Sequence, residues 1–112
     1  MKRATHNATY DIQYHFVWIP KYRKRVLTNK IKERLIQLIY QCAEINDFLV
    51  LELNIQPDHV HLLLTAKPRF SPAYIMQLIK GGTSRIIRFE FPQLTECLWG
   101  DSVWADGYFV ST

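Results

Sequence analysis

The chain has 112 residues, 48% of them hydrophobic, which fits one domain with a sizeable core and leaves little room for a second. Fourteen lysines and arginines against ten acidic residues give a net charge of +4, which favours an anionic partner without identifying it. No stretch approaches the roughly 18 apolar residues of a membrane span, and the N-terminus lacks the apolar region of a signal peptide. Cys42 and Cys97 fit no metal-binding or redox spacing. We therefore expect a cytoplasmic protein without a membrane span and with reduced thiols.

The first predicted element is a strand over residues 9–19, in which side chains alternate between two faces and which Pro20 ends. One face is expected to carry the mainly aromatic residues Tyr10, Ile12, Tyr14, Phe16 and Trp18. The other face is expected to carry Asp11, Gln13, His15, Val17 and Ile19.

A basic segment follows this strand directly and consists of Lys21, Tyr22, Arg23, Lys24 and Arg25. Four cations around one aromatic ring can bind phosphates and stack a base, as sites for single-stranded nucleic acid do. A solvated loop is the alternative, and the segment taken alone slightly favours that alternative.

The next two elements are ordinary core elements. A helix is predicted after Thr28 or Asn29, either of which can serve as its N-cap. Its apolar residues recur at helical spacing, at Ile31, Leu35, Leu38, Ile39, Cys42 and Ile45. Residues 48–55 form a predicted second strand, and the turn at residues 56–58 predicts an antiparallel hairpin with the strand that follows.

The strand after this turn begins with two histidines one residue apart, His59 and His61. Alternate residues of a strand share a face, so both imidazoles project together while Val60, Leu62 and Leu64 point into a core. Neutral imidazole is a common ligand of divalent metals, but two histidines need a third ligand or a phosphate oxygen to complete a coordination shell. For an arbitrary pair with this spacing, two exposed histidines without a ligand are the commoner outcome.

A second helix is predicted from Ser71, as its N-cap, and Pro72, as its first residue. Its buried face is expected to hold Tyr74, Ile75, Leu78, Ile79, Ile86 and Phe89, and a different edge carries Lys80, Ser84 and Arg88 at steps of four. Gly81 and Gly82 lie inside this helix, and each costs about 1 kcal/mol relative to alanine. Either close packing or the close approach of a ligand backbone explains them, and the sequence leaves both open.

The last part of the chain is predicted to contain one more strand. Pro92 ends the second helix, residues 94–100 are expected to be irregular, and residues 103–110 form an aromatic-rich strand with an interruption at Gly107.

The order of strand, helix, strand, strand, helix and strand predicts an α+β fold of the split βαβ type, ferredoxin-like and similar to RNA-recognition domains. Such a fold has a four-stranded antiparallel sheet with both helices on one face. If Val60, Leu62 and Leu64 face the helices, His59 and His61 lie on the open face, which RNA-recognition domains present to single strands.

Four motifs, at residues 14–23, 57–63, 78–84 and 107–112, resemble in order those of the single-tyrosine HUH transposases of small insertion sequences, the TnpA family. The resemblance implies a homodimer that binds hairpin ends of the element and cuts and rejoins single-stranded DNA without ATP. It implies that His59 and His61 hold Mg²⁺ or Mn²⁺ at the scissile phosphate, which a tyrosine hydroxyl attacks to form a 5′-phosphotyrosine link.

The family places its nucleophilic tyrosine, and a third metal ligand that is commonly glutamine, on a helix after the strand that here ends at Thr112. None of the six tyrosines matches that position; they are Tyr10, Tyr14, Tyr22, Tyr40, Tyr74 and Tyr108. We therefore expect residues 1–112 to form a single transposase domain that is incomplete at its C-terminus and inactive alone. The expected DNA-binding residues are Lys21, Tyr22, Arg23, Lys24, Arg25, Lys80, Gly81, Gly82, Ser84, Arg85 and Arg88.

Two alternatives remain. One is a single-stranded nucleic-acid binding module in which His59 and His61 bind no metal. The other is a zinc or other metal hydrolase that uses both histidines and Asp58, although Asp58 directly precedes His59 and would have to fold back to reach the same ion.

Overall fold

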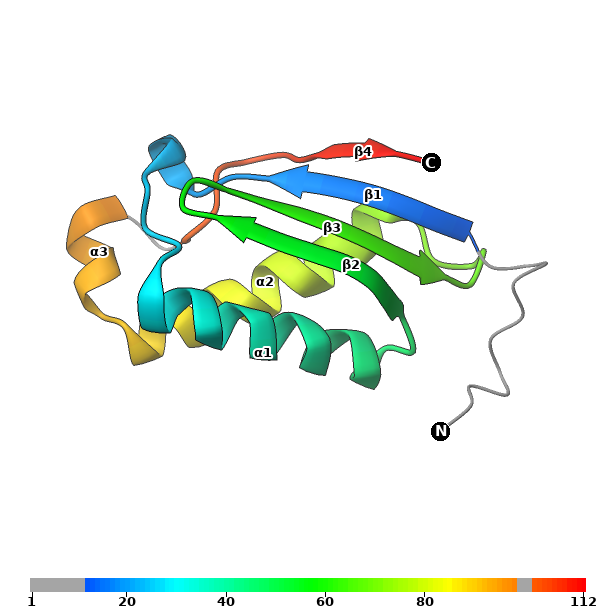
Figure 1. Ribbon diagram of the computed structural model, residues 1–112, viewed down its shortest axis with the longest axis horizontal. Coiled ribbons are helices and arrows are strands. Elements are labelled where there is room, and N and C mark those ends of the chain that lie inside the picture. Colours follow the sequence, from blue (N-terminus) through cyan, green and yellow to red (C-terminus); the bar gives the residue numbers. More distant parts are fainter. Residues whose placement is uncertain (1–11, 99–101) are drawn as a thin grey trace.

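The computed structural model describes residues 12–98 and 102–112 and shows a four-stranded antiparallel sheet with the two long helices on one face (Figure 1). Tyr10 and Asp11, predicted for the first strand, lie outside the described residues. The elements are β1 (Ile12–Trp18), the 3-10 helix η1 (Lys21–Arg23), α1 (Asn29–Ile45), β2 (Leu49–Gln56), β3 (His59–Ala66), α2 (Pro72–Glu90), α3 (Gln93–Leu98) and β4 (Phe109–Ser111).

The strands lie in the order β2, β3, β1, β4, and every neighbouring pair is antiparallel. This order, with α1 and α2 packed on the same side, is that of the ferredoxin-like split βαβ fold, so the predicted fold class is confirmed. β2 and β3 are joined by a two-residue turn, because Gln56 pairs with His59 at the end of their ladder. The predicted hairpin is therefore present.

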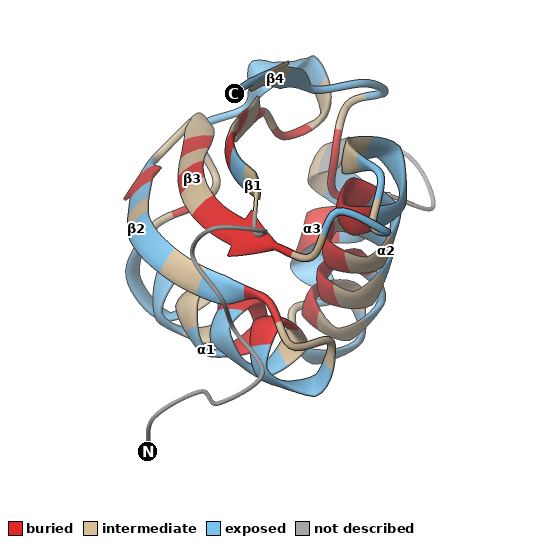
Figure 2. Cartoon of the chain, turned by 90° about the vertical axis from the view of Figure 1, so that its right-hand side faces the viewer, coloured by how far each residue is buried: buried red, intermediate tan, exposed pale blue. Residues whose placement is uncertain are grey.

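The core lies between the sheet and the helices, as the alternation of side chains predicts. Val60, Leu62 and Leu64 of β3 are each 0% exposed, and Phe16 of β1 is also 0% exposed. Figure 2 shows that buried residues recur along β3 and along the side of α2 that faces the sheet. Burial of each such side chain contributes about 1.5–3 kcal/mol, which fixes which face of β1 and of β3 turns to the helices. The residues between them in β1 and β3 must then point to the open face.

Both long helices begin where the sequence predicts. Thr28 is the N-cap residue of α1, although its side chain makes no capping hydrogen bond. Ser71 caps α2, since its Oγ accepts from the Tyr74 backbone N–H at 3.1 Å, and Pro72 follows it in the first turn. No helix in the described part of the chain is long and apolar enough to cross a lipid bilayer.

Three residues predicted for the buried helix faces are exposed instead. Ile45 is 75% exposed at the last position of α1, and Phe89 is 86% exposed near the end of α2. Tyr74 is 45% exposed. The residues of α2 that face the sheet are Ile75, Met76, Ile79, Thr83, Ser84 and Ile87. This stripe excludes Tyr74 and Phe89, which lie on other sides of the helix.

The C-terminal part differs most from the prediction. Residues 93–98 form the short helix α3, where an irregular segment was expected, and the strand predicted over 103–110 is reduced to β4 at residues 109–111. Trp104 makes only an isolated bridge with Pro20, and Gly107 turns the chain with a φ of +82°. Val103 and Trp104 are nevertheless buried. Their apolar side chains therefore reflect packing against the domain and not a strand.

Candidate functional site

His59 and His61 lie on the open face of β3, because the residues between and after them are buried against the helices. Their ring centroids are 5.0 Å apart and the ring planes make an angle of 79°. Burial lowers the pKa of His61, and charge on His59 and His15 acts in the same direction. The neutral imidazole, which is the form that binds metals, is therefore favoured at His61.

A third imidazole, that of His15 from β1, lies beside this pair. The Nδ1 atom of His61 is 3.4 Å from Nε2 of His15, and the two rings are stacked with centroids 5.5 Å apart. Residue alternation in the sequence predicted only that His15 lies on the face of its strand opposite the aromatic residues. In the structure Val17 pairs with His61, and this strand register brings His15, two residues before Val17, next to the histidine pair. The described residues include no preformed group of three or more His, Cys, Asp or Glu side chains suited to a metal ion.

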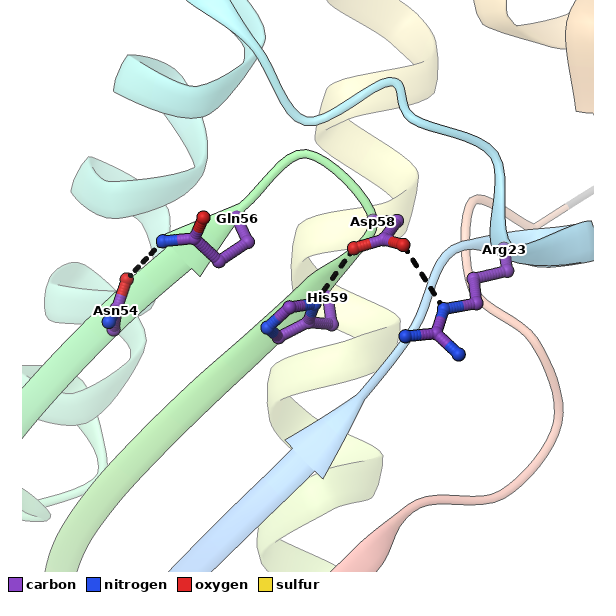
Figure 3. A network of polar contacts seen from close by, with 5 residues as sticks. All are labelled: Arg23, Asn54, Gln56, Asp58 and His59. Carbon is purple, nitrogen blue, oxygen red and sulfur yellow. Dashed lines mark hydrogen bonds and ion pairs between the residues drawn. The ribbon is translucent and has the colours of Figure 1, made fainter.

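Asp58, in the turn before β3, contacts both His59 and the basic segment (Figure 3). Its Oδ1 is 2.8 Å from Nδ1 of His59, and its Oδ2 accepts from Nε of Arg23 at 3.1 Å. The hydrogen bond with His59, together with Arg23, lowers the pKa of Asp58 against the opposing effect of desolvation. Both carboxylate oxygens thus have partners, which argues against Asp58 as a direct third ligand.

The polar surface continues onto β2. Asn54 pairs with His61 across the sheet and Gln56 pairs with His59, so their side chains share the open face. Gln56 Nε2 donates to Asn54 Oδ1 at 2.9 Å, as Figure 3 shows. Two amides therefore flank the histidines on the side away from β1.

The basic segment lies next to the histidines in space. Arg23 contacts Asp58, and the Leu27 backbone N–H donates to the Pro57 carbonyl oxygen at 3.0 Å, so the loop is held against the β2–β3 turn. Tyr22, Arg23, Lys24 and Arg25 are exposed. Four of the predicted DNA-binding side chains are thus accessible beside His59 and His61. The fifth residue of the basic segment, Lys21, is half-buried.

The predicted DNA-binding residues of α2 divide into two groups. The edge formed by Lys80, Ser84 and Arg88 is turned inward. The Lys80 ammonium donates to the carbonyl oxygens of residues 105 and 107, each at 2.8 Å, and the buried Ser84 hydroxyl accepts from the Val103 backbone N–H at 3.0 Å. Nε of Arg88 is buried without a hydrogen-bond partner in the described part of the protein. This edge therefore holds the C-terminal segment, a role that the sequence did not reveal.

The second group is Gly81, Gly82 and Arg85. Gly81 and Arg85 are exposed, and Gly82 is half-buried. A Cβ atom added at either glycine would meet no heavy atom within 4 Å. Packing within the described part of the chain therefore does not require glycine at these positions.

Sequence comparison assigns the chain to a known family. The family described as Transposase IS200 like matches residues 8–112. The chain belongs to this family. The ISDra2 transposase TnpA of Deinococcus radiodurans is 35% identical over 92% of this chain and 74% of that relative. The transposase for insertion sequence element IS200 of Salmonella typhimurium is 25% identical over 99% of this chain and 73% of that relative.

Solved structures agree with this assignment and with the fold. The crystal structure of a candidate transposase from Deinococcus radiodurans R1 superposes with a TM-score of 0.86, at 31% identity, and covers 100% of this chain and 85% of that one. A tyrosine transposase bound to a REP hairpin superposes with a TM-score of 0.61 at 14% identity, covering 99% of this chain and 60% of that one. The second likeness concerns the fold alone.

Proposed function

We propose that the domain binds hairpin ends of an insertion sequence as single-stranded DNA and takes part in cutting and rejoining them as a homodimer. In this proposal His59 and His61 are the protein ligands of Mg²⁺ or Mn²⁺ at the scissile phosphate. The observation that carries the proposal is the position of this histidine pair on the open sheet face, directly beside the exposed cations of the basic segment. Membership of a transposase family supports the choice of DNA as the partner.

The two imidazole nitrogens would form a neutral, incomplete ligand set for such an ion. Phosphate oxygens of the DNA would add the oxygen donors that Mg²⁺ and Mn²⁺ prefer. A bound ion would polarise the phosphate as a Lewis acid. The chain's own contribution is to fix the two imidazoles on a rigid strand and to place phosphate-binding cations of the basic segment next to them.

None of the described tyrosines lies at the position that the family resemblance gives the nucleophile. Tyr14 is buried, the ring of Tyr108 packs on that of Phe16, with centroids 6.0 Å apart, and Tyr22 is exposed in the basic segment. We therefore expect a polypeptide of these 112 residues to bind DNA without forming a covalent adduct. A tyrosine contributed by another chain of a dimer would complete the reaction.

The metal assignment can be tested by thermal melting with Mn²⁺. The ion should raise the melting temperature of the wild type, because it binds the native state preferentially. The double variant His59→Ala, His61→Ala should lose this shift, whereas Glu33→Gln, which removes one exposed carboxylate from α1, should retain it. An equal shift in the double variant would contradict the assignment. If hairpin DNA still binds tightly and Mn²⁺ has no effect on any variant, the domain is a binding module without a metal.

Catalysis can be tested by complementation. A fluorescent single-stranded substrate with a hairpin and cleavage site is incubated with this chain and with a relative that has a nucleophilic tyrosine but lacks its own histidine pair. Cleavage should appear only in the mixture, with the covalent adduct on the relative. An adduct on the 112-residue chain itself would refute this part of the proposal.

A further inference from the structure

The turn between β2 and β3 places one carboxylate between two functional side chains. Asp58 contacts Nδ1 of His59 at 2.8 Å through one oxygen and Nε of Arg23 at 3.1 Å through the other (Figure 3). The three residues come from separate parts of the site: the basic segment, the turn and the first position of β3. Asp58 therefore links the basic segment to the histidine pair.

The chemistry of this contact decides which nitrogen of His59 is free. An ionised carboxylate only accepts hydrogen bonds, so Nδ1 of His59 must carry the hydrogen. A carboxyl group of ordinary acidity is ionised at neutral pH. The Nε2 lone pair of His59 is then left available for a ligand.

We propose that Asp58 is a positioning residue that holds His59 in the Nδ1–H tautomer for metal binding and orients the Arg23 guanidinium toward the DNA phosphate. The metal part of this inference rests on the function proposed above, whereas the tautomer of His59 does not. Histidine ligands of metals commonly donate their other ring nitrogen to a carboxylate, which fixes the ring and strengthens the ligand.

The same contact also stabilises the backbone conformation of Arg23. Its backbone has a φ of +51° and that of Tyr22 a φ of +58°, conformations that cost free energy for residues other than glycine. The ion pair with Asp58 helps to keep the loop in this shape. The ion pair uses only Nε of Arg23, and within the described structure no hydrogen bond donated by the two terminal nitrogens is seen. These nitrogens form an edge suited to two phosphate oxygens.

His61 has an analogous but weaker contact, in which Nδ1 lies 3.4 Å from Nε2 of His15. If Nδ1 of each paired histidine is engaged by its neighbour, both Nε2 atoms remain for one ion. The shorter contact to a charged partner makes Asp58 the stronger of the two positioning groups.

The tautomer can be measured directly without metal. Long-range ¹H–¹⁵N correlation spectra of the apoprotein at about pH 8, where imidazoles are neutral, distinguish the two ring nitrogens of His59. The wild type should show the Nδ1–H form. Asp58→Ala should shift His59 toward the Nε2–H form that predominates in free imidazole side chains, and Asp58→Asn, whose amide oxygen still accepts, should shift it less.

Metal and DNA binding give the second set of measurements. Mn²⁺ affinity should fall about 10- to 100-fold in Asp58→Ala and by a smaller factor in Asp58→Asn. Hairpin affinity without metal should also fall in Asp58→Ala. The slope of log affinity against log salt concentration should stay the same in this variant, because the Arg23 charge is kept. Arg23→Met should flatten that slope by about one unit. Glu33→Gln, which removes one exposed carboxylate from α1, should change none of these quantities.

The outcomes separate the two proposals. A wild-type His59 in the Nε2–H form, or a tautomer and an Mn²⁺ affinity that are unchanged in Asp58→Ala, would overturn the role of Asp58. If the wild type shows the Asp58-dependent Nδ1–H form but binds no Mn²⁺, the control of the His59 tautomer stands and the metal site proposed above falls.

Discussion

Replacing the two glycines inside α2 by alanine should make the protein more stable and less able to bind DNA. Neither Gly81 nor Gly82 has a positive φ, and a Cβ at either position would meet no heavy atom within 4 Å. The folded helix therefore accepts the methyl group without strain, and the unfolded chain loses conformational freedom. Each change should raise the free energy of unfolding by about 0.5–1 kcal/mol, and both together by about 1–2 kcal/mol.

For a domain of this size, 1 kcal/mol corresponds to about 4 °C or more in melting temperature. Urea unfolding of the single and double variants, monitored by circular dichroism, would measure the free energies. Gly107→Ala is a matched control, because its surroundings are equally open but its φ is +82°. There the same methyl group should lower stability by about 1 kcal/mol or more.

The same variants should lose hairpin affinity if a DNA backbone approaches α2 at the glycines. The exposed Arg85 lies one helical turn after Gly81, on the surface where such a strand would run. Displacing one charge-assisted phosphate contact costs about 1.5–3 kcal/mol, which corresponds to a loss of tenfold or more. Fluorescence anisotropy with a labelled hairpin measures the affinity. If the variants are more stable and bind DNA as well as the wild type, DNA does not approach α2 at the glycines. If the variants lose stability, the space around Gly81 and Gly82 is not open.

Three further predictions concern other parts of the domain. Lys80→Met should lower the free energy of unfolding by about 1–3 kcal/mol, because it removes two hydrogen bonds to carbonyl oxygens of the C-terminal segment, and hydrogen exchange should accelerate in that segment. Neutralising both Lys24 and Arg25 should flatten the logarithmic salt dependence of hairpin binding by about two units, and an unchanged slope would place the DNA elsewhere. Burial raises the pKa of the Cys42 thiol, so the unfolded state gains more from ionisation above about pH 9 and stability should fall there as pH rises. Cys42→Ala should lose less stability than the wild type between pH 8 and 10, as urea unfolding would show.

Local sequence patterns were sufficient to predict much of the framework. The alternation in β1 and β3 determines which side chains are buried, since a strand has a period of two residues, and this placed His59 and His61 on the open face. The Ser71–Pro72 start of α2 was predictable for the same reason, because a cap depends on neighbouring residues only. The order of the elements then restricted the fold to the split βαβ type.

The composition of the site depended on tertiary structure. Arg23 and Asp58 are 35 residues apart in the sequence, His15 and His61 are 46 apart, and no local pattern encodes either contact. The segment around Trp104 resembled a strand because it is apolar, but its path is determined by hydrogen bonds to α2, including that of Lys80. The alternation of buried and exposed side chains follows from the spacing of neighbouring residues and can be inferred from the sequence. Strand register and loop position depend on the packing of the whole domain, and these determine which polar side chains surround the histidine pair.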